Sequence, residues 1–227
     1  MNARIVICVL LSAVALLAAG MRPASTPMAL VMKAIPEVQK QFSGSDWSPA
    51  VKSDQLSGGD KLRTGDKGLA ILKFLDKSIV RVRERSEVTL LSGQGGAPLT
   101  KIIDLRQAVI GFDIRKQVNE QFRFTSPTSV ASIRGTRGKL TDHERNDTLV
   151  VIEGLVNLKN QVSNNDKDIP AGYIGFSGAD GSLSSRPATP AELADASNAA
   201  LGGGENELNL EMKDSKGNKK SLKIKYK

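Results

Sequence analysis

The stretch TSPTSVASIRGTRG, from Thr125 to Gly138, contains a short apolar run that stops at Arg134-Gly135-Thr136. Pro127 cannot donate a hydrogen bond to a β-sheet, so it marks the start or the edge of a strand, and VASI forms a short buried strand after it. Gly135 permits a bulge or a corner with positive φ. Arg134 offers several donors to neighbouring carbonyl groups, and the Thr136 hydroxyl offers one that closes the turn. We therefore interpret the break as a corner between strands rather than as a ligand site.

Alternation with a period of two continues on both sides of this corner, from about residue 29 to residue 184. In QFRFT, just before it, Phe122 and Phe124 share one face while Arg123 points away. Short strands that recur about every 8–12 residues, without helices between them, are typical of an all-β fold. We predict a two-sheet β-sandwich or β-roll of many short strands. The other expected strands are LAILKFL (69–75), SIVRVRE (78–84), EVTLL (87–91), TKIIDLR (100–106), TLVVIE (148–153), LVNLK (155–159) and YIGF (173–176).

Two connections between these strands carry turn signals. Asp76-Lys77 separates LAILKFL from SIVRVRE. Glu153-Gly154 separates TLVVIE from LVNLK, and we interpret it as a two-residue hairpin turn.

One short helix is expected after the strands, in TPAELADASNAALGGG. Thr189 is a candidate N-cap, Pro190 suits the first helical position, and Glu192 completes a capping box. Gly202 is a candidate C-terminal stop. The segment is rich in alanine and about 12 residues long, so we expect it to pack weakly or to serve as a spacer.

The C-terminal tail alternates again and is expected to form a β-hairpin around the turn signal at 215–218. One side of the hairpin is apolar, and the other carries lysines. The apolar positions are Leu208, Leu210 and Met212 in the first strand and Leu222, Ile224 and Tyr226 in the second.

The N-terminus has the pattern of a secretory signal peptide over residues 1–20. A short basic start with Arg4 precedes an apolar run from Ile5 to Ala19, which is short for a membrane span of about 20 residues. The single cysteine, Cys8, lies inside this run, so cleavage leaves a chain without thiols. We expect an exported protein, periplasmic or otherwise extracellular, with no membrane span after cleavage.

The net charge of +8 is concentrated at the C-terminus, because residues 213–227 carry seven lysines and one aspartate. Two possible anion-binding sets follow. The first is the run of lysines Lys219, Lys220, Lys223, Lys225 and Lys227. The second is Arg81, Arg83 and Arg85, which alternate and would line one face of a strand. For these arginines, a solvated face with acidic neighbours is the favoured alternative, because the β-domain is nearly neutral.

No pattern for catalysis, metal binding or a cofactor is found. His143 is the single histidine; it lies in the charged segment TDHERND, and no G-x-S-x-G motif accompanies it, so we interpret it as a solvated surface residue. Zinc needs several His or Cys ligands, and SNNDKD (163–168) lacks the spacing of an EF-hand loop. No P-loop or strand–GxGxxG–helix unit occurs. We therefore predict a protein that is not an enzyme, has no cofactor or metal, and binds no nucleic acid.

The stretch from residue 47 to residue 176 resembles the FecR domain, the extracytoplasmic module of ferric-dicitrate-type signalling regulators. Its segments are similar, in order, to that family's L-x-x-G-D-x-x-x-T-G-x-x-x-A-x-L opening, strand–D-G-S–strand hairpin, F-x-V-x-T-P…VRGT stretch, V-x-E-G-x-V-x-V hairpin and closing aliphatic-x-A-G strand. These segments are WSPA (47–50), LSGGDKLRTGDKGLAILKF (56–74), FLDKSIVRV (74–82), FRFTSPTSVASIRGT (122–136), VIEGLVNL (151–158) and IPAGYIGF (169–176). The resemblance implies structural roles for Asp60, Thr64, Gly65, Pro127, Arg134, Gly135, Thr136, Glu153 and Gly154.

The chain departs from the family in two places. Lys77 replaces the turn glycine, so this turn is expected to differ or to carry mild strain. The family's regulators have a cytoplasmic segment that engages a sigma factor, and a membrane helix, before this domain. Here a signal peptide stands in that place, so we expect a stand-alone exported version of the domain.

The expected function is that of a non-enzymatic interaction or sensing module in the bacterial cell envelope, with a protein or an envelope polysaccharide as its partner. Three alternatives stay open: a polyanion- or glycan-binding protein acting through the basic tail, the extracytoplasmic part of a signal-transduction system, and an enzyme that attacks envelope polysaccharide with a carboxylate pair in a cleft. The expected segments are a signal peptide (1–20), a flexible lead-in (21–32), a FecR-like β-domain (33–184), a linker with a short helix (185–206) and a basic hairpin tail (207–227).

Overall fold

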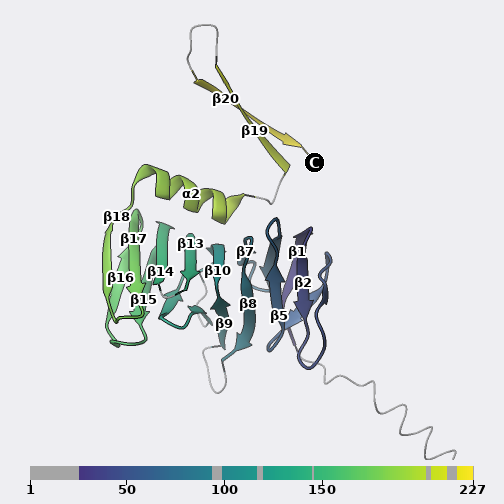
Figure 1. Cartoon of the computed structure of the whole chain (residues 1–227), viewed down its shortest axis with the longest axis horizontal. Helices are drawn as coiled ribbons and strands as arrows, with labels where there is room; N and C mark the ends of the chain where they lie inside the picture. Colours follow the sequence, from purple (N-terminus) through teal and green to yellow (C-terminus); the bar gives the residue numbers. More distant parts are fainter. Residues whose placement is uncertain are drawn as a thin grey trace, which may run out of the picture.

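The computed structural model describes residues 26–93, 99–116, 120–144, 146–202, 206–213 and 219–226. Two nine-stranded sheets stack on each other, and one helix lies over the outer side of one of them (Figure 1). The all-β sandwich with a short helix near its C-terminal end is confirmed. No helix among the described residues is long and apolar enough to cross a membrane.

The sheet that carries the helix is called sheet 1, and the other sheet 2. In spatial order, sheet 1 contains β18 (Leu183–Pro187), β17 (Tyr173–Gly178), β14 (Asn146–Glu153), β13 (Thr136–His143), β10 (Ala108–Ile114), β7 (Ile79–Val82), β6 (Leu69–Phe74), β1 (Pro27–Ile35) and β4 (Gln55–Ser57). Sheet 2 contains β16 (Asp166–Pro170), β15 (Leu155–Asn160), β12 (Ser129–Ile133), β11 (Glu120–Thr125), β9 (Leu99–Arg106), β8 (Glu87–Ser92), β5 (Lys61–Thr64), β2 (Val38–Gln41) and β3 (Ser48–Pro49).

The chain passes repeatedly from one sheet to the other, after one or two strands in each. β9 and β11 pair in parallel, and the other described pairs are antiparallel. Eight of the described crossings contain a residue with positive φ, which lets the backbone turn sharply. These residues are Glu37, Ser53, Gly59, Arg85, Gln107, Gly135, Gly154 and Gly172.

Arg134-Gly135-Thr136 is one of these crossings. β12 ends at Ile133 in sheet 2, and β13 begins at Thr136 in sheet 1. Gly135 has a φ of 66°. The interpretation of this stretch as a corner is confirmed.

The prediction of a hairpin turn at Glu153-Gly154 is wrong. β14 pairs with β13 and β17 in sheet 1, whereas β15 pairs with β12 and β16 in sheet 2. Gly154, with a φ of 90°, is therefore another corner between the sheets. A hairpin turn and a corner both need positive φ, so this local signal does not separate them.

The connection at Asp76-Lys77 is a true hairpin, since β6 and β7 pair antiparallel. Lys77 has a φ of 69°, the conformation that a glycine would adopt without strain. The Ser78 amide donates to Asp76 Oδ1 at 2.8 Å and helps to close the turn.

The core lies between the sheets and is built mainly from Val, Ile and Leu around four phenylalanines. Phe74 and Phe112 come from sheet 1, and Phe122 and Phe124 from sheet 2. The ring centroids of Phe74 and Phe122 are 4.9 Å apart, and those of Phe112 and Phe124 are 5.1 Å apart. As predicted, Phe122 and Phe124 share a buried face.

Two predicted segment boundaries need correction. Residues 27–32 belong to strand β1 rather than to a flexible lead-in, and β18 extends sheet 1 to Pro187. Residues 1–25, which include the predicted signal peptide, lie outside the described residues.

The C-terminal hairpin forms a two-stranded sheet of its own from β19 (Asn206–Lys213) and β20 (Lys219–Tyr226). Its register pairs Leu208 with Ile224 and Leu210 with Leu222. The predicted hairpin is confirmed at the level of the backbone, while its turn at 215–218 lies outside the described residues.

Candidate functional site

The outer face of sheet 1 carries α2 (Pro190–Leu201), which lies across the strands (Figure 1). We call this surface the helix platform. One residue from each of seven neighbouring strands forms a row in register under and beside the helix. The row is Ile71, Arg81, Gly111, Lys139, Val150, Ile174 and Arg186.

Gly111 lets the helix backbone touch the sheet. A Cβ at this position would lie 2.0 Å from the carbonyl oxygen of Ala199, so no side chain fits there. Ala196, Ala199 and Ala200 are buried on the lower side of the helix. Ala196 packs in a small apolar cluster with Val150 and Ile174, separate from the main core.

Two arginines bind the last carbonyl groups of α2. Arg81 donates to the carbonyl oxygens of Ala200 and Gly202, the latter at 3.0 Å. Arg83 donates to the carbonyl oxygens of Asn198 and Ala199. The Asn198 oxygen also accepts from the Gly202 amide at 2.8 Å. The last carbonyl groups of a helix generally lack partners within it, and the negative end of the helix dipole favours cations there. Burial is the main cause that lowers the pKa of both guanidinium groups.

The three alternating arginines therefore do not form one open anion-binding face. Arg81 is only 6% exposed under the helix, which also excludes the solvated face that was the alternative for this residue. β7 ends at Val82, and Arg85 lies at a crossing with a φ of 53°. Its Nε donates to Asp66 at 2.7 Å on the surface.

The N-terminus of α2 is fixed by a capping box, as predicted. The Thr189 hydroxyl accepts from the Glu192 amide at 3.3 Å, and the Glu192 carboxylate accepts from the Thr189 amide at 2.8 Å. Arg186 from β18 also pairs with Glu192 at 2.7 Å, which is the main cause that lowers the pKa of Glu192 to about 2. The helix is thus held at both ends, and the expectation of weak packing or a spacer is wrong.

Two grooves open on the outer side of sheet 1. One, of about 320 Å³, is lined in part by Arg83, Lys139 and Asp195, and Lys139 pairs with Asp195 at 2.6 Å. The other, of about 180 Å³, is lined by residues around Arg137, which pairs with Asp113 and Glu153, both at 3.3 Å. Charges of both signs line each groove and largely pair with one another, so neither groove selects a strongly charged ligand.

The corners at Gly135 and Gly154 pack against each other. A Cβ on Gly154 would lie 2.6 Å from the Gly135 carbonyl oxygen and 2.8 Å from Thr136 Oγ1. The Thr136 hydroxyl donates to the Leu155 carbonyl oxygen at 3.0 Å and so joins the two crossings. The predicted part of Thr136 in closing this corner is present, with a partner from the second crossing.

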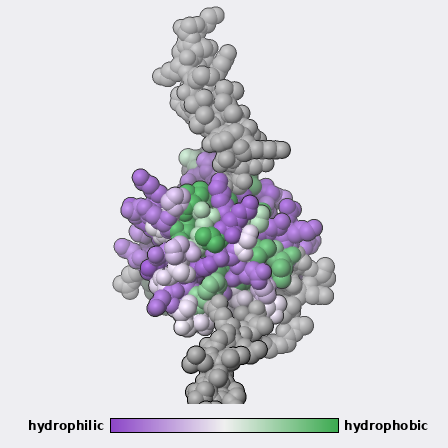
Figure 2. All heavy atoms as spheres, turned by 90° about the vertical axis from the view of Figure 1, so that its right-hand side faces the viewer, coloured by the Kyte–Doolittle hydropathy of each residue, from purple (hydrophilic) through white to green (hydrophobic). Residues whose placement is uncertain are grey.

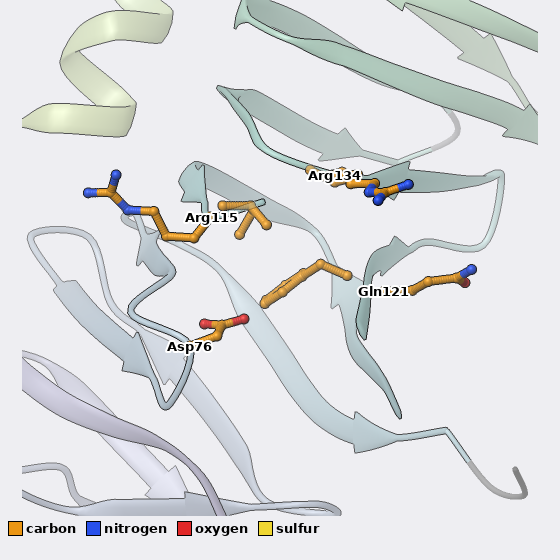
Figure 3. Close-up of a pocket in the computed structure, with 7 residues that line it drawn as sticks. Asp76, Arg115, Gln121 and Arg134 are labelled. Carbon is orange, nitrogen blue, oxygen red and sulfur yellow. The ribbon is translucent and has the colours of Figure 1, made fainter. Parts of the chain in front are cut away.

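Arg134 does not tie down carbonyl groups as predicted. Its side chain is exposed and makes no hydrogen bond with a residue that the structure describes. A hollow of about 10 Å³ lies beside it (Figure 3). The guanidinium groups of Arg115 and Arg134 point in opposite directions there, and Asp76 pairs with Lys101 at 2.7 Å. These side chains do not converge on a ligand.

The opening motif of the resemblance also builds connections. Asp60 is buried and accepts from the amides of Ser57 at 2.8 Å and Ser43 at 3.1 Å. Thr64 Oγ1 accepts from the Ser86 amide at 3.0 Å at the crossing from β5 to β6. A Cβ on Gly65 would lie 2.5 Å from the Glu37 carboxylate, so this crossing also needs a glycine.

Pro127 lies in the turn between β11 and β12, in keeping with its predicted place at a strand start. The hydroxyls of Ser126, Thr128 and Ser129 around it all donate to Asp147 Oδ2, which is buried on β14. Sequence reasoning missed Asp147. The available signal was the run of three hydroxyl residues, which together need a buried acceptor.

The remaining candidates do not assemble a reactive site in the described part of the chain. His143 is exposed at the end of β13. No group of three His, Cys, Asp or Glu side chains among the described residues is arranged to hold a metal. The structure does not describe the side chains of the tail lysines, Lys219 to Lys227.

Comparison with known proteins gives one family match and a distant likeness in structure. Residues 60–157 match the family model described as FecR protein. No curated protein sequence matches the chain. Two crystal structures of a protein assigned as an anti-sigma factor, from Parabacteroides distasonis, share 7% identity with the chain at a TM-score of 0.48. The likeness covers 56% of this chain and 59% of that one.

Proposed function

Because residues 60–157 form a FecR domain, we propose that the protein is a regulator-related module that binds or senses a partner in the bacterial cell envelope without catalysing a reaction. Its partner is a protein or an envelope polysaccharide. The domain acts as a rigid carrier for surfaces such as the helix platform.

The observation that carries this proposal is the position of the family's motif residues. Asp60, Thr64, Gly65, Gly135 and Gly154 all lie at connections between strands, where they accept or donate hydrogen bonds or allow close approach. Their chemistry is used to shape the backbone. Because these motif residues build the scaffold, we assign binding to other side chains on its surface.

Crosslinking in the native envelope tests this function. Full-length protein carrying a photoreactive residue at Asn198, on the exposed side of the groove beside α2, should capture one discrete partner. The same photoreactive residue at Lys159, on the exposed side of β15 in sheet 2, is the matched control. Equal capture from both positions would contradict a specific partner at the helix platform, and turnover of an envelope glycan by the purified protein would contradict the non-enzymatic proposal.

Export is the second part of the proposal, and the pattern of residues 1–20 supports it. Cleavage near residue 20 should give a periplasmic or secreted product without Cys8. Intact-mass measurement of periplasmic and secreted fractions checks this. A full-length product that remains with membranes would contradict export.

A second candidate function is binding of a polyanion through the C-terminal tail. Residues 213–227 carry seven lysines and one aspartate, and β19 and β20 pair with neither large sheet. A basic hairpin separate from the sandwich is free to present its lysines to an anionic glycan. The competing explanation is that lysines on open edges prevent edge-to-edge aggregation.

Retention on heparin resin tests the tail. Deletion of residues 207–227 should abolish retention while the sandwich keeps its melting temperature. Replacement of Lys219, Lys220, Lys223 and Lys225 by Gln should lower the salt concentration needed for elution step by step. Full retention of the truncated protein would rule the tail out.

A further inference from the structure

Two carboxyl groups lie next to each other inside the sandwich, away from the helix platform. Asp142 on β13 and Asp147 on β14 are partners in register, and they are 4% and 1% exposed. Like charges opposite each other on neighbouring strands repel, and burial makes two ionised groups more costly still. A single proton on the pair removes that repulsion.

Asp147 is the carboxyl group that receives the hydroxyl hydrogen bonds of the neighbouring turn. Its Oδ2 accepts hydrogen bonds from the hydroxyls of Ser126, Thr128 and Ser129. Hydrogen bonds to a charged carboxylate favour the charged form. The negative charge thus sits beside the turn between β11 and β12.

Asp142 is the group that the surroundings keep protonated. Its Oδ2 accepts from the Gln107 amide at 2.9 Å, and its carboxyl group lies within hydrogen-bonding reach of Asp147. Asp147 Oδ1 is buried, and no hydroxyl, amide or guanidinium among the described residues donates to it. A proton on Asp142 supplies this missing donor. Burial, and then the charge of Asp147, raise the pKa of Asp142 to about 6.

We propose that Asp142 and Asp147 share one buried proton, and that loss of this proton loosens the turn formed by residues 126–129. With both groups ionised, repulsion inside the sandwich is relieved when Asp147 moves outward with the hydroxyls bound to it. The turn is therefore locked in acid and loosened near neutral pH. A role of this lock in sensing rests on the proposed function, whereas the shared proton does not.

The other charges near the pair are few. Arg106, at the end of β9, favours the ionised form of Asp142 but is largely turned to solvent, where it pairs with Asp104 at 3.3 Å. The turn between β11 and β12 offers hydroxyls, and β17 offers Ser177, the register partner of Asp147. His143 is an ionisable side chain that follows Asp142 in the chain, but it is exposed. It therefore needs a control of its own.

Hydrogen exchange of the full chain at pH 5 and pH 7, divided by the intrinsic exchange rates, tests the lock. Protection of the amides of Thr128, Ser129 and Val130 should fall about tenfold or more from pH 5 to pH 7. In Asp142→Asn, an amide group donates to Asp147 at every pH, so protection should stay high. His143→Gln should behave like wild type.

Carbon-13 NMR titration of the wild-type carboxyl groups keeps the test decisive if Asp142→Asn fails to fold. One buried aspartate should titrate well above the usual range near 4, and its signal should vanish in any folded variant of Asp142. Normal titration of all aspartates would overturn the proposal. So would pH-independent protection in wild type, the same pH dependence in Asp142→Asn, or its loss in His143→Gln. Loss of partner binding with an intact titration would count against the proposed function alone.

Discussion

At the residue scale, backbone conformation at single positions shapes this fold. Lys77 has a φ of 69° in the β6–β7 hairpin, and the left-handed region costs a residue with a Cβ about 1 kcal/mol. The sequence predicted strain here from the FecR motif alone. Gly135 and Gly154 use the same region where the chain crosses between sheets.

Lys77→Gly should stabilise the protein by up to about 1 kcal/mol. The gain is relief of backbone strain, reduced by the greater freedom of glycine in the unfolded chain. Urea denaturation measures it. Lys73→Gly, at an exposed site inside β6, should instead destabilise; equal effects at both positions would show that the turn carries no strain.

Alanine at the two packed corners should be costly, and more so at residue 154. A Cβ on Gly154 meets the backbone carbonyl of Gly135, whereas a Cβ on Gly135 meets the side chain of Lys116 at 2.9 Å. We expect losses of roughly 3 kcal/mol and 1–2 kcal/mol in the free energy of unfolding. Arg134→Ala, beside the same corner, should change it by less than about 0.5 kcal/mol. A large loss for Arg134→Ala with mild losses for the glycines would contradict this assignment.

At the element scale, α2 is a part of the sandwich rather than an appendage. Its buried alanines pack against Gly111. Arg81 and Arg83 hold its C-terminal end, and Arg186 holds its N-terminal end. An alanine-rich helix of 12 residues is marginal by itself, so its stability comes from this docking.

Arg81→Ala should release the C-terminal turn of α2. The change leaves the carbonyl groups of Ala200 and Gly202 without their donor, at a cost of about 1–3 kcal/mol. Limited proteolysis should cut near residue 200 faster, and the melting temperature should fall. Arg85→Ala, which removes a surface arginine, should change neither. Protection of the helix in Arg81→Ala would mean that alanine packing suffices.

At the scale of the whole molecule, two sheets of nine strands enclose one apolar core that contains a polar end near Asp147. Figure 2 shows the right-hand side of Figure 1, where hydrophilic side chains predominate and hydrophobic ones form small separate patches. On strand β1, Leu30 and Met32 are 36% and 42% exposed, whereas the residues of the main core are buried. Burial of that core is the main contribution to global stability.

Global stability should fall as pH rises from about 4 to about 6. The pKa of Asp142 is about 6 in the folded protein, compared with 3.8 for an exposed aspartate. Between these two pH values the folded state therefore binds more protons than the unfolded state. The stabilisation is complete below pH 4 and lost above pH 6, by an amount on the order of 1–3 kcal/mol. Urea denaturation across this range measures it. Asp142→Asn should lack this component, and equal pH slopes in both proteins would contradict it.

Much of the architecture follows from local pattern. Alternation in segments such as QFRFT and EVTLL predicted strands, because period two places one face in the core. The capping box at Thr189 and Glu192 predicted where α2 begins, since both partners lie within one turn of chain. The positive φ at Gly135 followed from the same local reasoning.

What the sequence could not determine depends on partners distant in the chain. Glu153-Gly154 reads as a hairpin because nothing local says that β15 joins the opposite sheet. Arg81 reads as a solvated or anion-binding residue because its partner carbonyl lies 121 residues away. Asp142 and Asp147 become a proton-sharing pair only through strand register and burial between sheets. The sequence by itself determined the strands, most of the turns and the helix of this sandwich. Tertiary structure decided which strands meet and which charges are buried, because desolvation and register arise only when distant segments pack.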